Sequence, residues 1–318
     1  NFMGTGNRVK AALSRSETRD SYSLGYTDPY FTENGVSQGV SAYYRKTKYD
    51  DDNVSNYVTD SYGATLNYSY PVDETKRVSA GLNVDNTKVR GGRFLGISNA
   101  QEILDDGGTQ TFDEDDDGVS TFRNDYQTYN LLLGWDYSTL DRPVFPTKGM
   151  SHSVDATIGL GDANYQKLVY SGNVYYPLYK DVVARGYTKL GYGNDLPFYE
   201  NFYAGGYGSV RGYESSTLGP KSQVYFDAIN DPDNQTFLAE EVGGNALVTF
   251  GSELILPMPF KGDWADQVRP VLFAEGGIRQ LVQSHSVTRC LSMTKKVMRL
   301  KKFSSRSVIH SRLLIKSI

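Results

Sequence analysis

Apolar and polar residues alternate along most of residues 1–277, which is the pattern of β-strands with one apolar face. In 62–70, tyrosine, alanine and leucine occupy every second position, and glycine, threonine, asparagine and serine occupy the positions between them. Similar alternation elsewhere predicts about eleven strands and no helix. The predicted strands are 6–16, 20–28, 36–48, 62–70, 78–86, 129–137, 150–160, 166–178, 181–193, 245–257 and 268–276.

The segments between the predicted strands alternate in length. Short turns that contain Pro, Asp or Gly alternate with connections that are mostly longer and more polar, notably 91–124 and 194–244. Short turns on one side and long loops on the other are typical of an outer-membrane barrel, and strands of about ten residues suit a tilted bilayer crossing. A soluble β-sandwich is the alternative, although its strands are usually about 5–6 residues long. We predict an all-β fold, an antiparallel transmembrane β-barrel.

Composition narrows the class of protein without identifying a site. The chain has 318 residues, and its 25 tyrosines and 32 glycines suit antiparallel strands and tight turns. No stretch approaches the roughly 20 apolar residues of a membrane-spanning helix. The single Cys290 excludes an internal disulfide, and neither a metal-ligand spacing nor a Ser, His and Asp arrangement can be identified. We therefore expect no enzymatic activity, no metal and no cofactor.

The composition changes abruptly after Gly277. Residues 278–318 contain ten Lys and Arg but no Asp, Glu, Gly, Tyr or Pro, whereas residues 1–277 carry 23 basic and 37 acidic side chains. We predict a partial outer-membrane β-barrel domain over 1–277 and a basic tail over 278–318 that is frameshifted or otherwise non-native. The alternative is a tail that binds nucleic acid or anionic lipid. The acidic balance of the rest of the chain disfavours nucleic acid as a partner.

Two further polar features have simple interpretations. Residues 113–118 resemble the start of a calcium-binding loop, but the twelfth position is Asn124 where a glutamate is expected. We interpret this segment as a solvated external loop. His152 lies on the apolar side of its predicted strand, near the start of that strand, and we expect it at the membrane interface.

A segment rich in glycine and aromatic residues lies within the longest connection. Gly205, Gly206 and Gly208 permit backbone angles that other residues resist. The aromatic residues around them argue against a flexible linker. The charge in this segment is Arg211, which needs acidic partners if it is buried.

The phase of two later strands supplies candidate partners for Arg211. Glu253 in 245–257 and Glu275 in 268–276 both lie on the face opposite the apolar residues, and in an outer-membrane barrel that face lines the lumen. We therefore predict that the connection 194–244 folds into the lumen and that Arg211 pairs with Glu253 and Glu275. The alternative is that Arg211 is an exposed loop charge.

The same segment resembles the BamA family of outer-membrane assembly proteins, in the bacterial surface antigen superfamily. The likeness covers residues 1–277 and rests on several motifs in the family's order. The motifs are Asn1-Phe-Met-Gly-Thr-Gly6, Thr27-Asp-Pro-Tyr-Phe31, Leu140-Asp-Arg-Pro-Val-Phe-Pro-Thr-Lys-Gly149, Phe198-Tyr-Glu-Asn-Phe-Tyr-Ala-Gly-Gly206, Val210-Arg-Gly-Tyr213, Gly219-Pro-Lys221 and Val242-Gly-Gly-Asn-Ala246.

The resemblance implies a site, a function and partners. Val210, Arg211, Gly212 and Tyr213 would form the tip of a lumenal loop whose arginine pairs with acidic residues on the following strands. The implied function is insertion and folding of outer-membrane proteins in a Gram-negative bacterium. The implied partners are outer-membrane lipids, client β-barrel proteins and assembly-machine lipoproteins. A polypeptide-secretion transporter of the same superfamily and a passive porin-like barrel are the alternatives.

The chain departs from the family pattern at both ends. The family's barrel has sixteen strands, and it follows periplasmic repeats that recruit the lipoproteins. Here the likeness begins at the approach to the third strand and stops after Gly277, so the implied barrel is open or incomplete, with about eleven strands. An open edge in lipid leaves backbone groups unpaired, and we expect that this fragment alone does not insert client barrels.

Overall fold

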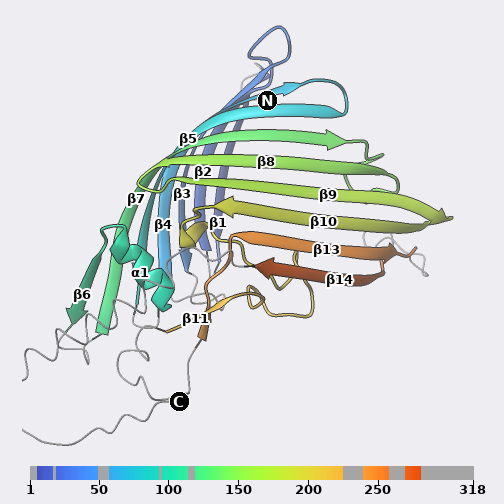
Figure 1. Ribbon diagram of the computed structural model, residues 1–318. Coiled ribbons are helices and arrows are strands. Elements are labelled where there is room, and N and C mark those ends of the chain that lie inside the picture. Colours follow the sequence, from blue (N-terminus) through green and yellow to red (C-terminus); the bar gives the residue numbers. More distant parts are fainter. Residues whose placement is uncertain are drawn as a thin grey trace, which may run out of the picture. The chain divides into compact units, whose positions relative to one another are not determined.

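The computed structural model describes residues 6–16, 19–48, 57–92, 95–113, 119–224, 239–257 and 269–280 (Figure 1). The chain divides into two compact units, 1–281 and 282–318, and the description that follows concerns the first. Eleven strands pair antiparallel in chain order, with β6 as an extra partner of β7. In the described residues β1 and β14 are the edges of this sheet, which is not closed. The predicted antiparallel arrangement of eleven successive strands is confirmed.

The large sheet runs along β1 (Arg8–Arg15), β2 (Arg19–Asp28), β3 (Ser37–Lys48), β4 (Tyr57–Pro71), β5 (Lys76–Gly91), β7 (Val119–Ser138), β8 (Gly149–Gly161), β9 (Tyr165–Tyr179), β10 (Val182–Asn194), β13 (Ala246–Ile255) and β14 (Val271–Gln280), and β6 (Thr109–Asp113) lies beside β7.

One face of this sheet is apolar and exposed. Leu66 pairs with Leu82 on the next strand, and Leu82 pairs with Leu131 on the strand after it. Leu82 is nevertheless 60% exposed. A sheet that presents such side chains to its surroundings suits a lipid environment. No helix in the described part of the chain has the length and apolar character needed to cross a membrane.

The opposite face carries a network of polar side chains. The amide of Asn130 donates to the Asn83 carbonyl oxygen over 2.9 Å, and the hydroxyl of Tyr165 donates to Asn130 over 3.1 Å. Asn83 also donates to the hydroxyl of Thr65 over 2.9 Å. Asn83 and Asn130 are each 7% exposed, so these bonds satisfy polar groups that would otherwise be costly to bury.

A row of rings crosses three strands near the turn between β7 and β8. His152 stacks between Tyr137 and Tyr170 with centroid separations of 6.0 Å on each side. Its Nδ1 lies 2.8 Å from the hydroxyl oxygen of Tyr170. The location of His152 at a membrane interface stays a prediction.

The prediction that the chain has no helix is wrong in the connection between β5 and β7. A helix, α1 (Ile97–Asp105), forms there, and its buried residues are Asn99, Ala100 and Ile103. Nine residues with so few apolar positions are too short to reveal a helical period. The connection from β10 to β13 holds a 3₁₀ turn, η2 (Phe198–Glu200), and a small sheet of β11 (Lys221–Gln223) and β12 (Ala239–Glu241).

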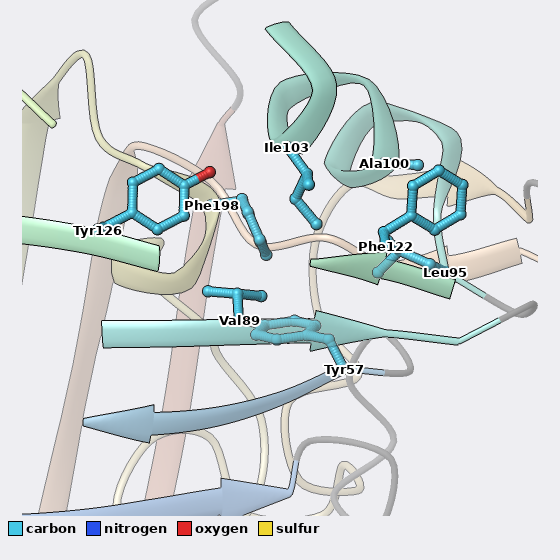
Figure 2. Close-up of a cluster of buried hydrophobic side chains, with 8 residues drawn as sticks. All are labelled: Tyr57, Val89, Leu95, Ala100, Ile103, Phe122, Tyr126 and Phe198. Atoms are coloured by element: carbon cyan, nitrogen blue, oxygen red, sulfur yellow. The ribbon is translucent and has the colours of Figure 1, made fainter. Parts of the chain in front are cut away.

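Three strands extend further toward the long connections than the alternation predicts. β4 begins at Tyr57, β5 ends at Gly91 and β7 begins at Val119. Their extended ends pack against α1 and η2 around a buried cluster (Figure 2), so packing rather than alternation determines where they end. The cluster consists of Tyr57, Val89, Leu95, Ala100, Ile103, Phe122, Tyr126 and Phe198, each at most 1% exposed.

Some predicted features lie outside the described residues. They include residues 114–118 of the acidic segment and Cys290. β14 continues to Gln280, three residues past Gly277. Residues 281–318 are not described, and the division into 1–277 and 278–318 therefore stays a prediction.

Candidate functional site: the seat of Arg211

The segment 202–218, which we call the glycine loop, is a compact structure held by its own backbone. Ala204 bridges to Leu218, whose N–H donates to the Ala204 carbonyl over 3.0 Å. Nearer the tip, the Gly206 N–H donates to the Tyr213 carbonyl over 3.1 Å. These bonds close the loop at two levels. Arg211 lies beyond the second of them, near the tip of the loop.

The predicted glycines adopt the backbone conformation that favours glycine. Gly205, Gly206 and Gly208 have φ angles of +110°, +81° and +90°. Gly205 is also in a confined position, because a Cβ there would lie 2.4 Å from the carbonyl oxygen of Glu214. A side chain at residue 205 would therefore force the loop open.

Two rows of side chains on the sheet receive the loop, and we call them the seat. They come from β9, β10, β13 and β14, and cross-strand register aligns them. Residues two apart on a strand face the same side, so the rows lie next to each other. The first row is Tyr175, Arg185, Glu253 and Phe273; the second is Asn173, Tyr187, Gly251 and Glu275.

Arg211 contacts both carboxylates of the seat. Its Nη2 lies 2.6 Å from Oε1 of Glu253 and 2.5 Å from Oε1 of Glu275, while its Nε donates to Glu275 over 2.7 Å. The backbone N–H of Arg211 donates to the other oxygen of Glu275 over 2.7 Å. The guanidinium carbon lies 3.7 Å from the centre of the Phe273 ring. The structure thus brings together the three charged residues that the sequence analysis paired.

Glycines on the wall make room for this contact. A Cβ on Gly277 would lie 3.1 Å from a methyl carbon of Val210, whose side chain is 4% exposed. The ring of Tyr187 lies across Gly251, and its hydroxyl donates to Glu275. Tyr213, the last residue of the predicted motif, is 56% exposed.

The seat balances its charges. Arg211 and Arg185 face Glu253 and Glu275, whose side chains are 9% and 5% exposed. Hydrogen bonding to Glu275 holds the pKa of Arg211 above its usual range, because the bond favours the charged guanidinium. Charge-assisted hydrogen bonds are strong and directional, so in this confined place they neutralise the charge of Arg211 and also fix the position of the loop.

Six of the eight residues of the seat were not predicted from the sequence: Asn173, Tyr175, Arg185, Tyr187, Gly251 and Phe273. Period two assigns each of them a face, but it does not say which residues lie side by side. That requires the register of β10 against β13, and the long connection between these strands leaves the register open.

A second contact attaches the base of the connection to β9. Lys167 donates to the carboxylate of Glu200 over 2.7 Å and to its carbonyl over 2.9 Å. The ammonium also lies 5.0 Å from the centre of the Phe202 ring. Phe202 packs with Ala204 and Leu247 in a small buried cluster, so the loop leaves a fixed base.

A third contact joins the two long connections. The carboxylate of Glu102 on α1 accepts a 2.8 Å hydrogen bond from the backbone N–H of Phe198. Burial, together with the charges of Asp106 and Asp105, raises the pKa of Glu102 to about 7 against the lowering effect of this bond. The packed state therefore favours the protonated carboxyl.

We predict that this third contact weakens as pH rises. The pKa of Glu102 is above its ordinary value of 4.5 when packed, so its stabilising contribution is complete below pH 4.5 and is lost as pH rises through about 7. Amide hydrogen exchange of α1 and η2, corrected for intrinsic rates, should be roughly tenfold faster at pH 8 than at pH 5.5. A tenfold change corresponds to a loss of stability equal to about one pKa unit of the shift. Glu102→Gln should remove this difference, and a difference that survives the substitution would contradict the assignment.

Comparison with known proteins gives a consistent family. The Omp85 superfamily domain matches residues 1–289. The chain is 33% identical over 290 residues to the outer membrane protein assembly factor BamA of Neisseria meningitidis serogroup B, covering 87% of this chain and 34% of that protein. It is 24% identical over 264 residues to BamA of Nitratidesulfovibrio vulgaris, covering 80% of this chain and 29% of that protein. The chain thus spans about a third of these relatives.

A solved structure has a similar fold. The crystal structure of BamA from Haemophilus ducreyi lacking POTRA domains 1–3 matches with a TM-score of 0.75 and 27% sequence identity. The match covers 88% of this chain and 53% of that one. The eleven-stranded sheet therefore corresponds to a large part of a β-barrel.

Proposed function

The chain belongs to the Omp85 superfamily, and from this premise we propose that it forms part of the barrel of an outer-membrane β-barrel assembly factor. The two relatives compared above are named outer membrane protein assembly factors. The proposed activity is insertion and folding of outer-membrane proteins in the same membrane. The exposed apolar face of the sheet supports that location.

The observation that favours an assembly factor over a passive barrel is the contact between Arg211 and two carboxylates on β13 and β14. In the proposed mechanism, insertion of a client opens the barrel along a seam between its first and last strands, while the rest of the barrel keeps its fold. We propose that the glycine loop lies in the lumen, where Arg211 holds β13 and β14 together through Glu253 and Glu275 and donates a hydrogen bond to Tyr187 of β10. Val210 and the glycines at 205, 206 and 208 shape the loop that delivers Arg211.

The proposed mechanism is physical and assigns no catalytic step. A weakly paired seam and a locally thinned bilayer lower the barrier to client insertion, while the braced wall keeps its structure. The proposed partners are outer-membrane lipids, client β-barrel proteins and the lipoproteins of an assembly machine. We also propose that residues 278–318 take no part in this activity.

Reconstitution of the full-length protein in lipid vesicles tests the proposal. Folding of an added outer-membrane protein, followed by its resistance to protease, should be faster than in vesicles without the protein. Export of a partner polypeptide without client insertion would instead indicate a secretion transporter. Steady ion conductance without accelerated folding would indicate a passive channel, and either result would overturn the proposed function.

A further inference from the structure

Glu253 is held by two arginines that come from different parts of the chain. Its Oε1 contacts Arg211 of the glycine loop at 2.6 Å, and its Oε2 contacts Arg185 of β10 at 2.9 Å. Arg211 already has a second carboxylate in Glu275. Binding of the loop therefore does not require a second cation, Arg185, on Glu253.

Within the described residues, the side chain of Arg185 contacts strands of the sheet and not the glycine loop. Its Nη2 and Nε donate to the side-chain oxygen of Asn173 over 2.6 and 3.3 Å. Its guanidinium carbon lies 4.7 Å from the ring centre of Tyr187 and 5.6 Å from that of Tyr175. These partners lie on β9, β10 and β13, so Arg185 keeps them when the loop leaves.

The two arginines have opposite effects on departure of the loop. Without Arg185, departure of Arg211 would leave Glu253 charged, confined and unpaired, which is strongly unfavourable. With Arg185 present, Glu253 keeps a cation, and Glu275 keeps the hydroxyl of Tyr187. Because both arginines share one carboxylate, their like charges also repel each other while the loop is seated. Both effects favour release.

We propose that Arg185 is a positioning residue that makes the seat of Arg211 reversible. It acts through Glu253, and it sets how often the glycine loop leaves the wall. The inference concerns this movement alone and does not depend on which client or activity the protein has. A residue that merely supported the wall would have the opposite effect, because its loss would loosen the loop.

Hydrogen exchange of the full-length protein in lipid vesicles tests this inference. In Arg185→Met, amides of residues 203–218 should exchange about tenfold more slowly than in the wild type, while those of β9, β10 and β13 keep their rates. Arg185→Gln, which is also neutral but can still hydrogen-bond to Asn173, should slow the loop in the same way. Arg185→Lys retains the charge and should restore exchange close to the wild-type rate.

The sign of the change decides the outcome. Faster or unchanged loop exchange in folded Arg185→Met or Arg185→Gln would overturn the proposal, because it would show that Arg185 supports the seated loop. Equal slowing in Arg185→Lys would also overturn it, since charge would then not be the cause. The experiment measures hydrogen exchange of the loop and not client assembly. Its result therefore stands whether or not the proposed function is correct.

Discussion

Replacement of Arg211 by alanine is expected to release the glycine loop and to destabilise its packed state by about 3–5 kcal/mol, the usual range when a buried ion pair loses one partner. Glu253 and Glu275, at 9% and 5% exposure, would lose the cation that joins them. The lower part of the range is expected, because Arg185 still contacts Glu253. The side chain of Arg211 is also 24% exposed, and contact with water weakens the ion pair, which again favours the lower part of the range.

Limited proteolysis of the full-length protein in lipid vesicles measures this release. Arg211→Ala should expose residues 202–218 to cleavage at protease concentrations that leave the wild type intact. Arg211→Lys keeps the charge without the planar fork that contacts two carboxylates, so its loop should show intermediate protection. Tyr207→Ala is the matched control in the same loop, because Tyr207 is 96% exposed. Wild-type resistance in Arg211→Ala would rule out the ion pair as the anchor.

Replacement of Phe198 by alanine is expected to detach η2 from α1 and to destabilise that contact by about 3–5 kcal/mol, as for other buried phenylalanines. Phe198 is 1% exposed. Its ring meets that of Tyr57 edge-on at 5.1 Å, and Figure 2 shows it within the cluster under α1. The cavity would be lined from two long connections, so both should loosen together.

Hydrogen exchange of α1 and η2 provides the measurement for this second variant. Phe198→Ala should speed exchange in both elements, whereas Phe198→Leu, which fills more of the space, should have a smaller effect. Leu104→Ala is the control on α1, because Leu104 is 38% exposed. Faster exchange confined to η2 would contradict the joint packing of the two connections.

The strands could be predicted from sequence because their two faces have different surroundings. In β5, Val78, Ala80, Leu82 and Val84 occupy the apolar face, and Ser79, Gly81, Asn83 and Asp85 occupy the polar one. Such strict alternation can be recognised in the sequence of a single strand, without knowledge of the neighbouring strands. It fails where a strand leaves this two-sided environment, as β4, β5 and β7 do near α1, because packing on the buried cluster then determines which residues are apolar.

The seat was only partly predictable for a related physical reason. Face assignment singled out Glu253 and Glu275, since period two places an acidic residue opposite its apolar neighbours. Arg185 escaped because its pairing with Glu253 depends on the register between β10 and β13. The connection between these strands is long, and no short turn fixes that register. The helix α1 escaped because its tertiary packing, not its own pattern, stabilises it.

We propose that the seated glycine loop supports client assembly, and one paired measurement tests this role most directly. Client folding rate and protease protection of residues 202–218 are recorded in the same vesicle preparation for the wild type, Arg211→Lys and Arg211→Ala. We predict that both quantities fall together, partly in Arg211→Lys and severely in Arg211→Ala. Wild-type client folding by Arg211→Ala with an unprotected loop would contradict the claim.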